Sequence, residues 1–336
     1  TQWGVRVVIG GSSSDWYTGG AGGVAYLDSF NWSTDTPCFA FNENLNNGEE
    51  KATAECISHE IGHTLGLRHD GTSTLGYYAG HGNGATGWAP IMGVGYYEEL
   101  VQWSKGEYPG ANMREDDLQI ITTQNGFGYR VDDHGNTRTS ATEFEVIAGV
   151  INDEGIIERN TDLDYFSFTT IGGQFDLDIT PFYLSPNLDI LATLYDAGGT
   201  VVATSNPTNA LNAEFNMTLG AGTYYVSIDG TGKAASGQDF GYSDYGSLGY
   251  FSITGTIPFL TEPEINVRGN GVSIVDGDTT PASADHTNFG STSIDDATTL
   301  RKFTIQNIGG ADVNLTGDPI VQIMGANAGD FTVTLV

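Results

Sequence analysis

The chain has 336 residues, which is enough for two or three domains with a core each. Its 42 acidic residues against 12 Lys and Arg give a net charge of −30, and such a field repels nucleic acid and anionic membranes. No apolar stretch approaches the roughly 18 residues of a membrane-spanning helix, so the sequence predicts no membrane span.

Three short strands and a long helix are predicted near the start of the chain. The apolar runs at 5–9, 23–27 and 38–41 predict the strands, and a loop rich in Gly and Ser follows the first of them. Asn47 resembles a helix cap because Glu50 follows three residues later. The run from 49 to 67 is then predicted as the helix.

The pattern at 59–70 is the most informative in the chain. It reads His-Glu-Ile-Gly-His-Thr-Leu-Gly-Leu-Arg-His-Asp, or H-E-x-x-H-x-x-G-x-x-H followed by Asp. On a helix, His59 and His63 project from one face about one turn apart, so that both imidazoles can bind one Zn²⁺. Gly66 can take the left-handed conformation that ends a helix and returns His69 to the metal. Three neutral imidazoles leave a fourth position open, as in catalytic zinc sites.

Glu60 lies on the same predicted helical turn but is rotated away from the ligand direction. This position suits a general base that acts on water rather than a metal ligand. The alternative interpretation is an ordinary helix with incidental histidines.

This stretch resembles the metzincin zinc endopeptidases, and Asp70 after the third histidine is most similar to the adamalysin/reprolysin branch, which has bacterial secreted relatives. The segment Pro90-Ile91-Met92-Gly93 fits the methionine turn of the metzincins. The resemblance implies that Met92 forms an apolar floor beneath the zinc without ligating it. Astacins and serralysins carry a tyrosine two residues later, where this chain has Val94. Tyr96 and Tyr97 are predicted to line the site or to pack.

The same resemblance implies a substrate-binding edge strand in the predicted catalytic domain (residues 1–135). Its residues are Gly23, Val24, Ala25, Tyr26 and Leu27, and their backbone would pair with an extended substrate. Only 58 residues precede His59, about half of what the family supplies, so the N-terminal part of the domain is expected to be missing.

Two cysteines fall in the predicted catalytic domain. Cys38 lies in the third strand and Cys56 lies one turn before His59 on the helix. They are compatible with a disulfide outside the cell or with two buried thiols.

The rest of the predicted catalytic domain allows fewer conclusions. His81 is a loop residue or a contact to the site or substrate, and 102–108 is a wall of the substrate pocket or a packed loop. Residues 115–122 predict a closing helix, because acidic residues occupy the first turn and apolar residues follow at helical spacing.

From about residue 142 the apolar period changes to two, which predicts a β-sandwich over 142–257. This segment resembles a bacterial pre-peptidase C-terminal domain. The similar patterns are Asp162-Leu-Asp-Tyr-Phe, Asn187-Leu-Asp-Ile, Leu194-Tyr-Asp-Ala-Gly and Ala221-Gly-Thr-Tyr-Tyr-Val. The resemblance implies an accessory module that aids folding, secretion or substrate attachment.

Asp162 and Asp164 are two residues apart and would share one face of a strand. They are compatible with a Ca²⁺ site, with a solvated acidic face or with buried hydrogen bonds.

A linker at 257–263 precedes a last segment, 264–336. This segment resembles the immunoglobulin-like surface modules of bacterial secreted proteins, and at this length the β-sandwich is expected to be incomplete.

The sequence therefore predicts a multidomain fold: an α+β metzincin-like catalytic domain followed by two β-sandwich domains. The predicted function is a secreted, extracellular zinc endopeptidase acting on proteins or peptides, with His59, His63 and His69 as ligands and Glu60 as general base. The alternative is a catalytically inactive fragment, or an adhesion or substrate-binding protein that binds a cell-surface or extracellular polymer through its β-sandwich modules.

Overall fold

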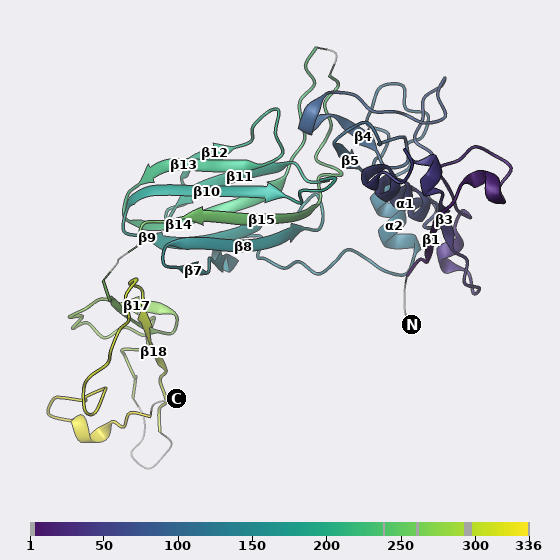
Figure 1. The fold of residues 1–336 in the computed structure, drawn as a ribbon. Coiled ribbons are helices and arrows are strands. Elements are labelled where there is room, and N and C mark those ends of the chain that lie inside the picture. Colours follow the sequence, from purple (N-terminus) through teal and green to yellow (C-terminus); the bar gives the residue numbers. More distant parts are fainter. Residues whose placement is uncertain (1–3, 238, 260–261, 292–297, 335–336) are drawn as a thin grey trace. The chain divides into compact units, whose positions relative to one another are not determined.

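The computed structural model describes residues 4–237, 239–259, 262–291 and 298–334, and the chain forms two compact units (Figure 1). The first comprises Thr1–Val146 and Val150–Ile257, and the second comprises Ile147–Gly149 and Pro258–Val336. No helix in the described part of the chain is long and apolar enough to cross a membrane.

The first unit begins with a small mixed sheet. β1 (Val7–Ile9) pairs parallel with β3 (Cys38–Ala40), and β2 (Gly23–Val24) pairs antiparallel with the other side of β3. The strand order β1-β3-β2 places β2 at an edge.

The edge strand is shorter than the sequence predicts. It contains Gly23 and Val24, whereas Ala25, Tyr26 and Leu27 lie outside it. The chain turns away because Asp28 takes a left-handed φ of 60° and its N–H donates to the carbonyl of His63 at 3.1 Å.

Helix α1 (Glu50–Thr64) packs against this sheet, and its start differs from the prediction. The cap is Glu49, whose carboxylate accepts the N–H groups of Lys51 and Ala52 at 3.1 and 2.6 Å. A carboxylate at this end is also favoured by the helix dipole. Asn47 instead takes a left-handed φ of 58° in the preceding turn.

A short parallel strand pair and a second helix follow α1. β4 (Trp88–Pro90) pairs with β5 (Leu100–Gln102). Helix α2 (Asp117–Gln124) begins two residues later than predicted, because the Asp116 side chain caps it by accepting the N–H of Gln119 at 2.9 Å.

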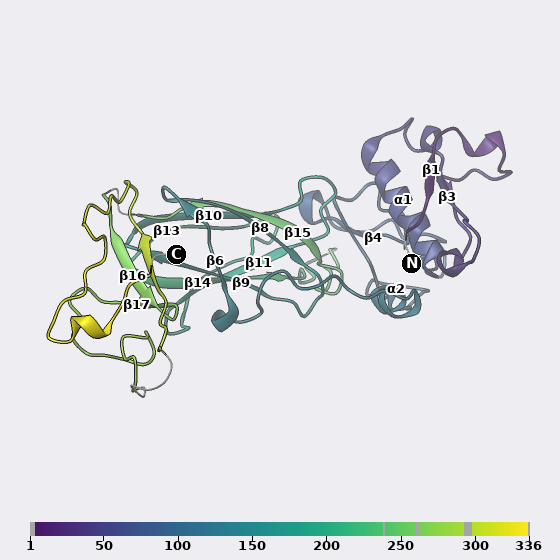
Figure 2. The same ribbon diagram turned by 90° about the horizontal axis from the view of Figure 1, so that it is seen from below.

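Two five-stranded sheets make up the rest of the first unit and share one apolar core (Figure 2). The first has the order β13-β10-β15-β8-β7, and the second has the order β12-β11-β14-β9-β6. The strands are β6 (Thr142–Glu143), β7 (Val146–Ile147), β8 (Val150–Ile157), β9 (Asp164–Thr170), β10 (Gly173–Pro181), β11 (Ile190–Asp196), β12 (Val201–Ser205), β13 (Ala213–Leu219), β14 (Gly222–Gly230) and β15 (Gly249–Thr256).

Alternate residues of these strands enter the core, as the period of two predicts. On β9, for example, Phe166 and Phe168 are buried while Tyr165 and Ser167 are half-buried.

The second unit contains a three-stranded antiparallel sheet, ordered β17-β16-β18. The strands are β16 (Ile265–Gly269), β17 (Val272–Ile274) and β18 (Phe303–Asn307). Among residues 262–291 and 298–334 only Gly269 and Asp285 are buried, and no second sheet covers this one. The immunoglobulin-like sandwich therefore stays a prediction.

The predicted combination of several sheets with few helices is confirmed. The remaining helical segments of the described chain are short 3₁₀ turns at Ser13–Asp15, Ser29–Asn31, Asn42–Asn44, Gly84–Thr86, Arg138–Ser140 and Ala328–Asp330. The metzincin fold and the boundaries 1–135, 142–257 and 264–336 stay predictions.

Candidate metal centre

Three histidines converge at the end of α1. His59 and His63 lie on successive turns of the helix, and His69 returns after the helix has ended. One ligand atom from each lies within 4.8 Å of the others, and the Nε2 atoms of His63 and His69 are 2.9 Å apart. The structure therefore brings together the three side chains that the sequence predicts as zinc ligands.

Backbone carbonyls orient two of the rings. His59 Nδ1 lies 2.9 Å from the carbonyl oxygen of Ile91, and His63 Nδ1 lies 2.8 Å from that of Leu67. A carbonyl only accepts, so each Nδ1 carries the proton and donates it. Each Nε2 is then the unprotonated atom, which is the form that binds a metal.

Burial favours the neutral form of these histidines. It lowers the pKa of His59 to about 3 and that of His69 to about 4, and in both cases the charge of a protonated His63 lowers the pKa further. Burial also lowers the pKa of His63 itself. Three neutral, converging imidazoles fit Zn²⁺, which prefers nitrogen ligands in tetrahedral geometry.

Gly66 reverses the chain between the second and third histidines. Its φ is 102°, as the sequence predicts for a residue that ends the helix, and the N–H of Leu67 donates to the carbonyl of Gly62 at 3.0 Å. A Cβ at Gly66 would lie 2.6 Å from Oδ1 of Asp28, so both the conformation and the space favour glycine here.

Glu60 lies directly beneath the edge strand. Its side chain is buried, and burial raises its pKa to about 7, which suits a general base near neutral pH. A Cβ on Gly23 would lie 2.6 Å from Oε1 of Glu60, so the glycine lets the backbone of β2 approach this carboxylate.

Met92 lies beneath the helix that carries the histidines. It is fully buried, and a Cβ at Gly62 would lie 2.4 Å from its sulfur. Its carbonyl accepts the N–H of Asp70 at 2.8 Å, which joins the methionine turn to the residue after His69. Met92 clusters with Leu67, Ile91 and Val101.

The two cysteines are free, buried thiols, so the disulfide between Cys38 and Cys56 is not formed. Cys56 instead has a hydrogen-bonding partner in Tyr96. Tyr96 is half-buried and packs against the cluster that Cys56 forms with Ala40, Leu45 and Ala52. Tyr97 is 76 % exposed and contacts Tyr96. Tyr96 therefore packs, whereas Tyr97 faces solvent.

Tyr77 lies beside two of the three histidines, a position that the sequence does not predict. Its ring centroid is 4.3 Å from that of His69 and 6.0 Å from that of His59. Burial and the charge of Glu60 raise its pKa. No spacing rule marks this position, because a loop brings it back over the histidines.

Two further predictions from the sequence concern His81 and the segment 102–108. Gln102 is buried and accepts the indole N–H of Trp88 at 2.9 Å, and Tyr108 is buried as well. Gln102 and Tyr108 are thus packed, and the half-buried Trp103 between them packs against the cluster that contains Met92, so the wall of a substrate pocket stays a prediction. His81 forms hydrogen bonds with Tyr78 and Gly241.

A second group of possible metal ligands lies near the start of β9. Carboxylate oxygens of Asp132, Asp162 and Asp164 lie within 4.8 Å of one another, and Asp132 is an addition to the pair that the sequence indicates. Asp164 is fully buried and neither carboxylate oxygen has a hydrogen-bond partner in the described part of the chain. Burial, followed by the charge of Asp162, raises the pKa of Asp164 to about 9.

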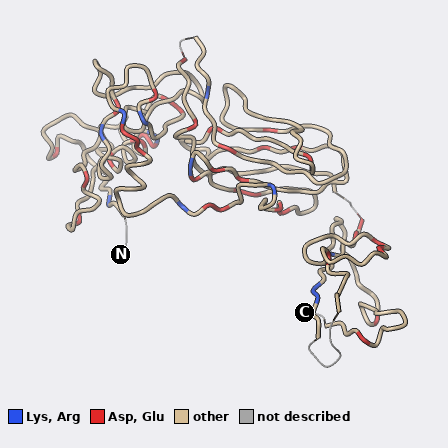
Figure 3. Tube along the Cα trace, turned by 180° about the vertical axis from the view of Figure 1, so that it is seen from behind, with Lys and Arg blue, Asp and Glu red and all other residues tan. Residues whose placement is uncertain are grey.

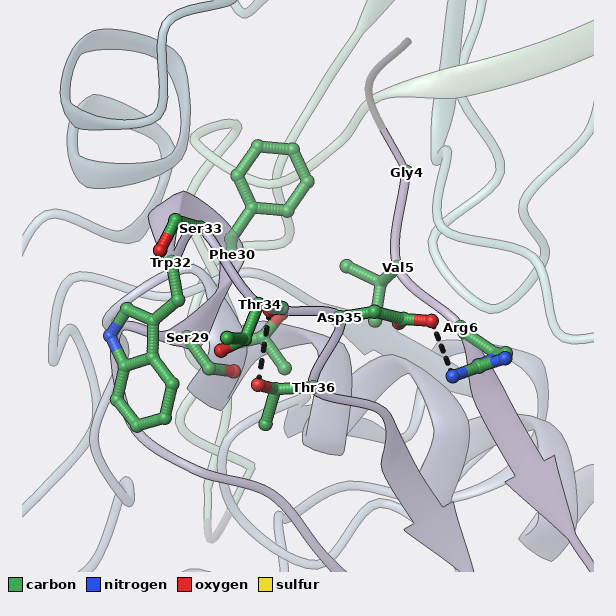
Figure 4. A pocket seen from close by; sticks show the side chains of 11 residues that line it. Gly4, Val5, Arg6, Ser29, Phe30, Trp32, Ser33, Thr34, Asp35 and Thr36 are labelled. Atoms are coloured by element: carbon green, nitrogen blue, oxygen red, sulfur yellow. Dashed lines mark hydrogen bonds and ion pairs between the residues drawn. The ribbon is translucent and has the colours of Figure 1, made fainter.

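A cavity of about 250 Å³ lies between the start of the chain and residues 29–36 (Figure 4). Arg6 and Asp35, which line it, form an ion pair. None of the three histidines lines it, and neither does Glu60. The cavity therefore excludes the side chains of the metal centre, although Thr64, which follows His63 on α1, lines it.

Acidic positions are distributed along the whole trace, and basic positions are sparse (Figure 3). The metal centre therefore lies in a protein with a negative field, which favours cations.

Comparison with known protein families gives a match to the first part of the chain. Residues 4–70 match the reprolysin-like metallo-peptidases of family M12B. The match includes the three histidines and Glu60, confirms the resemblance stated from the motif, and supports a zinc-dependent metallopeptidase that acts on proteins or peptides. No curated protein matches the chain.

Two solved structures are similar to part of the chain. One is the pre-peptidase C-terminal domain of a collagenase from Bacillus anthracis, with 14% identity, coverage of 36% of this chain and 100% of that chain, and a TM-score of 0.27. The other is a periplasmic inhibitor of g-type lysozyme from Aeromonas hydrophila, with 10% identity, coverage of 35% and 95%, and a TM-score of 0.25.

Proposed function

We propose that this protein is a secreted zinc-dependent endopeptidase of the metzincin type that cleaves extracellular proteins or peptides. The observation that carries the proposal is the convergence of His59, His63 and His69 within 4.8 Å beside the buried Glu60. The extracellular location rests on the resemblance to secreted enzymes.

In this proposal the chain orients the substrate and moves a proton. When bound to the three histidines, Zn²⁺ would polarise the scissile carbonyl and acidify a water molecule. Glu60 removes a proton from the water and returns it to the leaving nitrogen, for which a pKa of about 7 is well matched. The open edge of β2 can pair with an extended peptide and hold it next to Glu60.

The substitution Glu60→Gln tests the mechanism. Loss of a general base is expected to reduce the rate of casein or peptide hydrolysis by about 10²- to 10⁴-fold. Zinc content, measured by atomic absorption, is expected to stay at the wild-type level because Glu60 is not a ligand.

Glu55→Gln is the matched control, because Glu55 lies on the same helix, is buried and pairs with Lys51 at 3.0 Å. It is expected to keep activity. Undiminished hydrolysis by Glu60→Gln, or by wild-type protein after zinc has been removed with a chelator, would refute the proposed function.

We also propose that Asp132, Asp162 and Asp164 bind Ca²⁺. Carboxylate oxygens are the preferred ligands of this ion. A fully buried Asp164 without hydrogen-bond partners is costly unless a cation or a proton neutralises it. Asp132 precedes the sheets, so the ion would connect the segment after α2 to the start of β9.

Thermal unfolding of EDTA-treated protein tests the calcium proposal. Calcium at about one hundred times its Kd is expected to add about 2.7 kcal/mol to the free energy of unfolding. Asp164→Asn is expected to abolish this response, while Asp178→Asn, which changes an exposed carboxylate on β10, is expected to keep it. A wild-type melting temperature that does not respond to calcium would contradict the proposal.

A further inference from the structure

The segment between β14 and β15, residues 231–237 and 239–248, packs against the part of the chain that surrounds the metal centre (Figure 1). Tyr242 from this segment forms a buried cluster with Trp88, Leu100, Tyr108 and Leu211. We call residues 231–237 and 239–248 the β14–β15 segment.

Polar contacts surround this shared cluster. Lys233 donates to Oγ1 of Thr86 at 2.8 Å and forms an ion pair with Asp239 at the same distance. The hydroxyl of Ser243 donates to Glu107 at 2.6 Å. The contact thus combines apolar burial with paired polar groups, as stable interfaces do.

His81 makes the first connection from this segment toward the metal centre. Its Nε2 lies 2.7 Å from the carbonyl oxygen of Gly241, and its Nδ1 lies 2.9 Å from the hydroxyl of Tyr78. Because a carbonyl only accepts, Nε2 donates to Gly241. Nδ1 of the neutral ring then accepts from Tyr78, and both partners determine the orientation of the imidazole.

Tyr78 continues this connection to the residue after His69. Its N–H donates to the carbonyl of Asp70 at 2.7 Å, and its ring stacks on Tyr108 with centroids 4.3 Å apart. The hydroxyl of Tyr108 donates to Oδ1 of Asp70 at 3.2 Å. Asp70 therefore has two contacts to this aromatic pair, in addition to its bond to Met92.

Tyr245 makes the second connection. Its hydroxyl donates to the Asp116 carboxylate at 2.7 Å and accepts the N–H of Leu118 at 2.8 Å, so it supports the first turn of α2. Ile120 and Ile121 of α2 pack against the cluster that contains Met92. The β14–β15 segment is thus linked to the metal centre through two separate series of contacts.

We propose that the β14–β15 segment is a structural part of the metal centre. His81 and Tyr245 act as positioning residues: the first restrains His69 through Tyr78 and Asp70, and the second restrains Met92 through α2. The inference rests on the proposed zinc centre. If it holds, the part of the chain that contains the two five-stranded sheets contributes to metal affinity. This role would be additional to the substrate attachment or secretion that the resemblance implies.

Zinc affinity of the full-length chain tests this inference. The dissociation constant is measured by competition with a fluorescent chelator, at a temperature where circular dichroism shows every variant to be folded. His81→Leu and Tyr245→Phe are each expected to weaken zinc binding by about threefold, less than the roughly 10- to 100-fold loss for groups that hydrogen-bond to a metal ligand directly, because both act through intervening residues. Tyr78→Phe keeps the aromatic stack but removes the hydroxyl, and is expected to resemble His81→Leu.

His134→Leu is the matched control. His134 also contacts a hydroxyl and a carbonyl oxygen, those of Thr142 at 2.8 Å and Glu154 at 3.0 Å, but it lies beside the sheets. Its substitution is expected to leave zinc affinity unchanged.

A double variant, His81→Leu with Tyr78→Phe, shows whether the two residues act in one connection. The factor by which the double variant weakens zinc binding is expected to be smaller than the product of the factors for the two single variants. The effects of substituting two residues in contact are not additive in free energy. Wild-type affinity in both His81→Leu and Tyr245→Phe, or an equal loss in His134→Leu, would overturn the inference. Absence of zinc binding by the wild-type chain would instead overturn the proposed function on which it rests.

Discussion

Tyr77 shows how the metal centre extends beyond the residues of its motif. His59, His63 and Glu60 could be assigned from the sequence because the repeat of a helix alone determines which of its side chains share a face. Tyr77 lies against His69 because residues 70–78 fold back over it, a path that no residue spacing encodes. The same holds for Asp132, which joins Asp162 and Asp164 from about 30 positions earlier in the chain.

Replacing Tyr77 tests the role of its ring. An aromatic contact of this kind contributes about 1 kcal/mol, so Tyr77→Ala is expected to weaken zinc binding about fivefold by freeing the His69 ring. Tyr77→Phe keeps the ring and is expected to bind zinc as the wild type does.

Tyr97→Ala serves as the control for Tyr77, because Tyr97 is 76 % exposed. Isothermal titration of the apo-proteins with zinc measures all three variants. Equal affinities for Tyr77→Ala and the wild type would show that the ring does not restrain His69.

At the scale of elements, the sequence predicted the type of the first three strands and of α1 and α2 better than their limits, and it did not predict β4 and β5. Helix α1 ends at Thr64 rather than Leu67, although the helix-ending glycine was identified correctly. Its cap was misplaced by two residues, because Asn is a preferred cap residue whereas Glu is not, and only the backbone path brings the Glu49 carboxylate to the free N–H groups. The edge strand was overestimated for a similar reason, since the hydrogen bond from Asp28 to His63 turns the chain away.

Gly66 provides a prediction for the end of this helix. Gly66→Ala places a Cβ at a φ of 102° and next to Asp28, and is expected to lower the free energy of unfolding by about 1–2 kcal/mol. It is also expected to weaken zinc binding, because the position of His69 depends on this turn.

Gly128→Ala is the control for Gly66, because an added Cβ there has nothing within 4 Å. Urea unfolding and zinc titration compare the two variants. A Gly66→Ala variant as stable as Gly128→Ala would contradict the role assigned to the left-handed turn.

At the scale of the whole molecule, contacts between distant segments decide how the predicted parts are organised. The segments predicted as a catalytic domain and a β-sandwich share the cluster of Trp88, Tyr108 and Tyr242 and belong to one compact unit. His81, which the sequence left as either a loop residue or a contact of the site, forms a hydrogen bond 160 positions away with Gly241. If the proposed role of the β14–β15 segment holds, zinc affinity depends on the whole first unit and not on residues 1–135 alone.

The sequence by itself identified the three histidines that the structure brings together, the proposed base Glu60, and the change from helical to strand periodicity near residue 142. These features depend on residues that are close in the sequence. Their relative positions follow from the regular period of a single helix or strand. Only the tertiary structure decided that Cys38 and Cys56 remain thiols, that Tyr77 covers the histidines, and that Gly241 contacts His81. The reason is that these contacts depend on the path of the backbone through several elements. No local pattern of residues specifies that path.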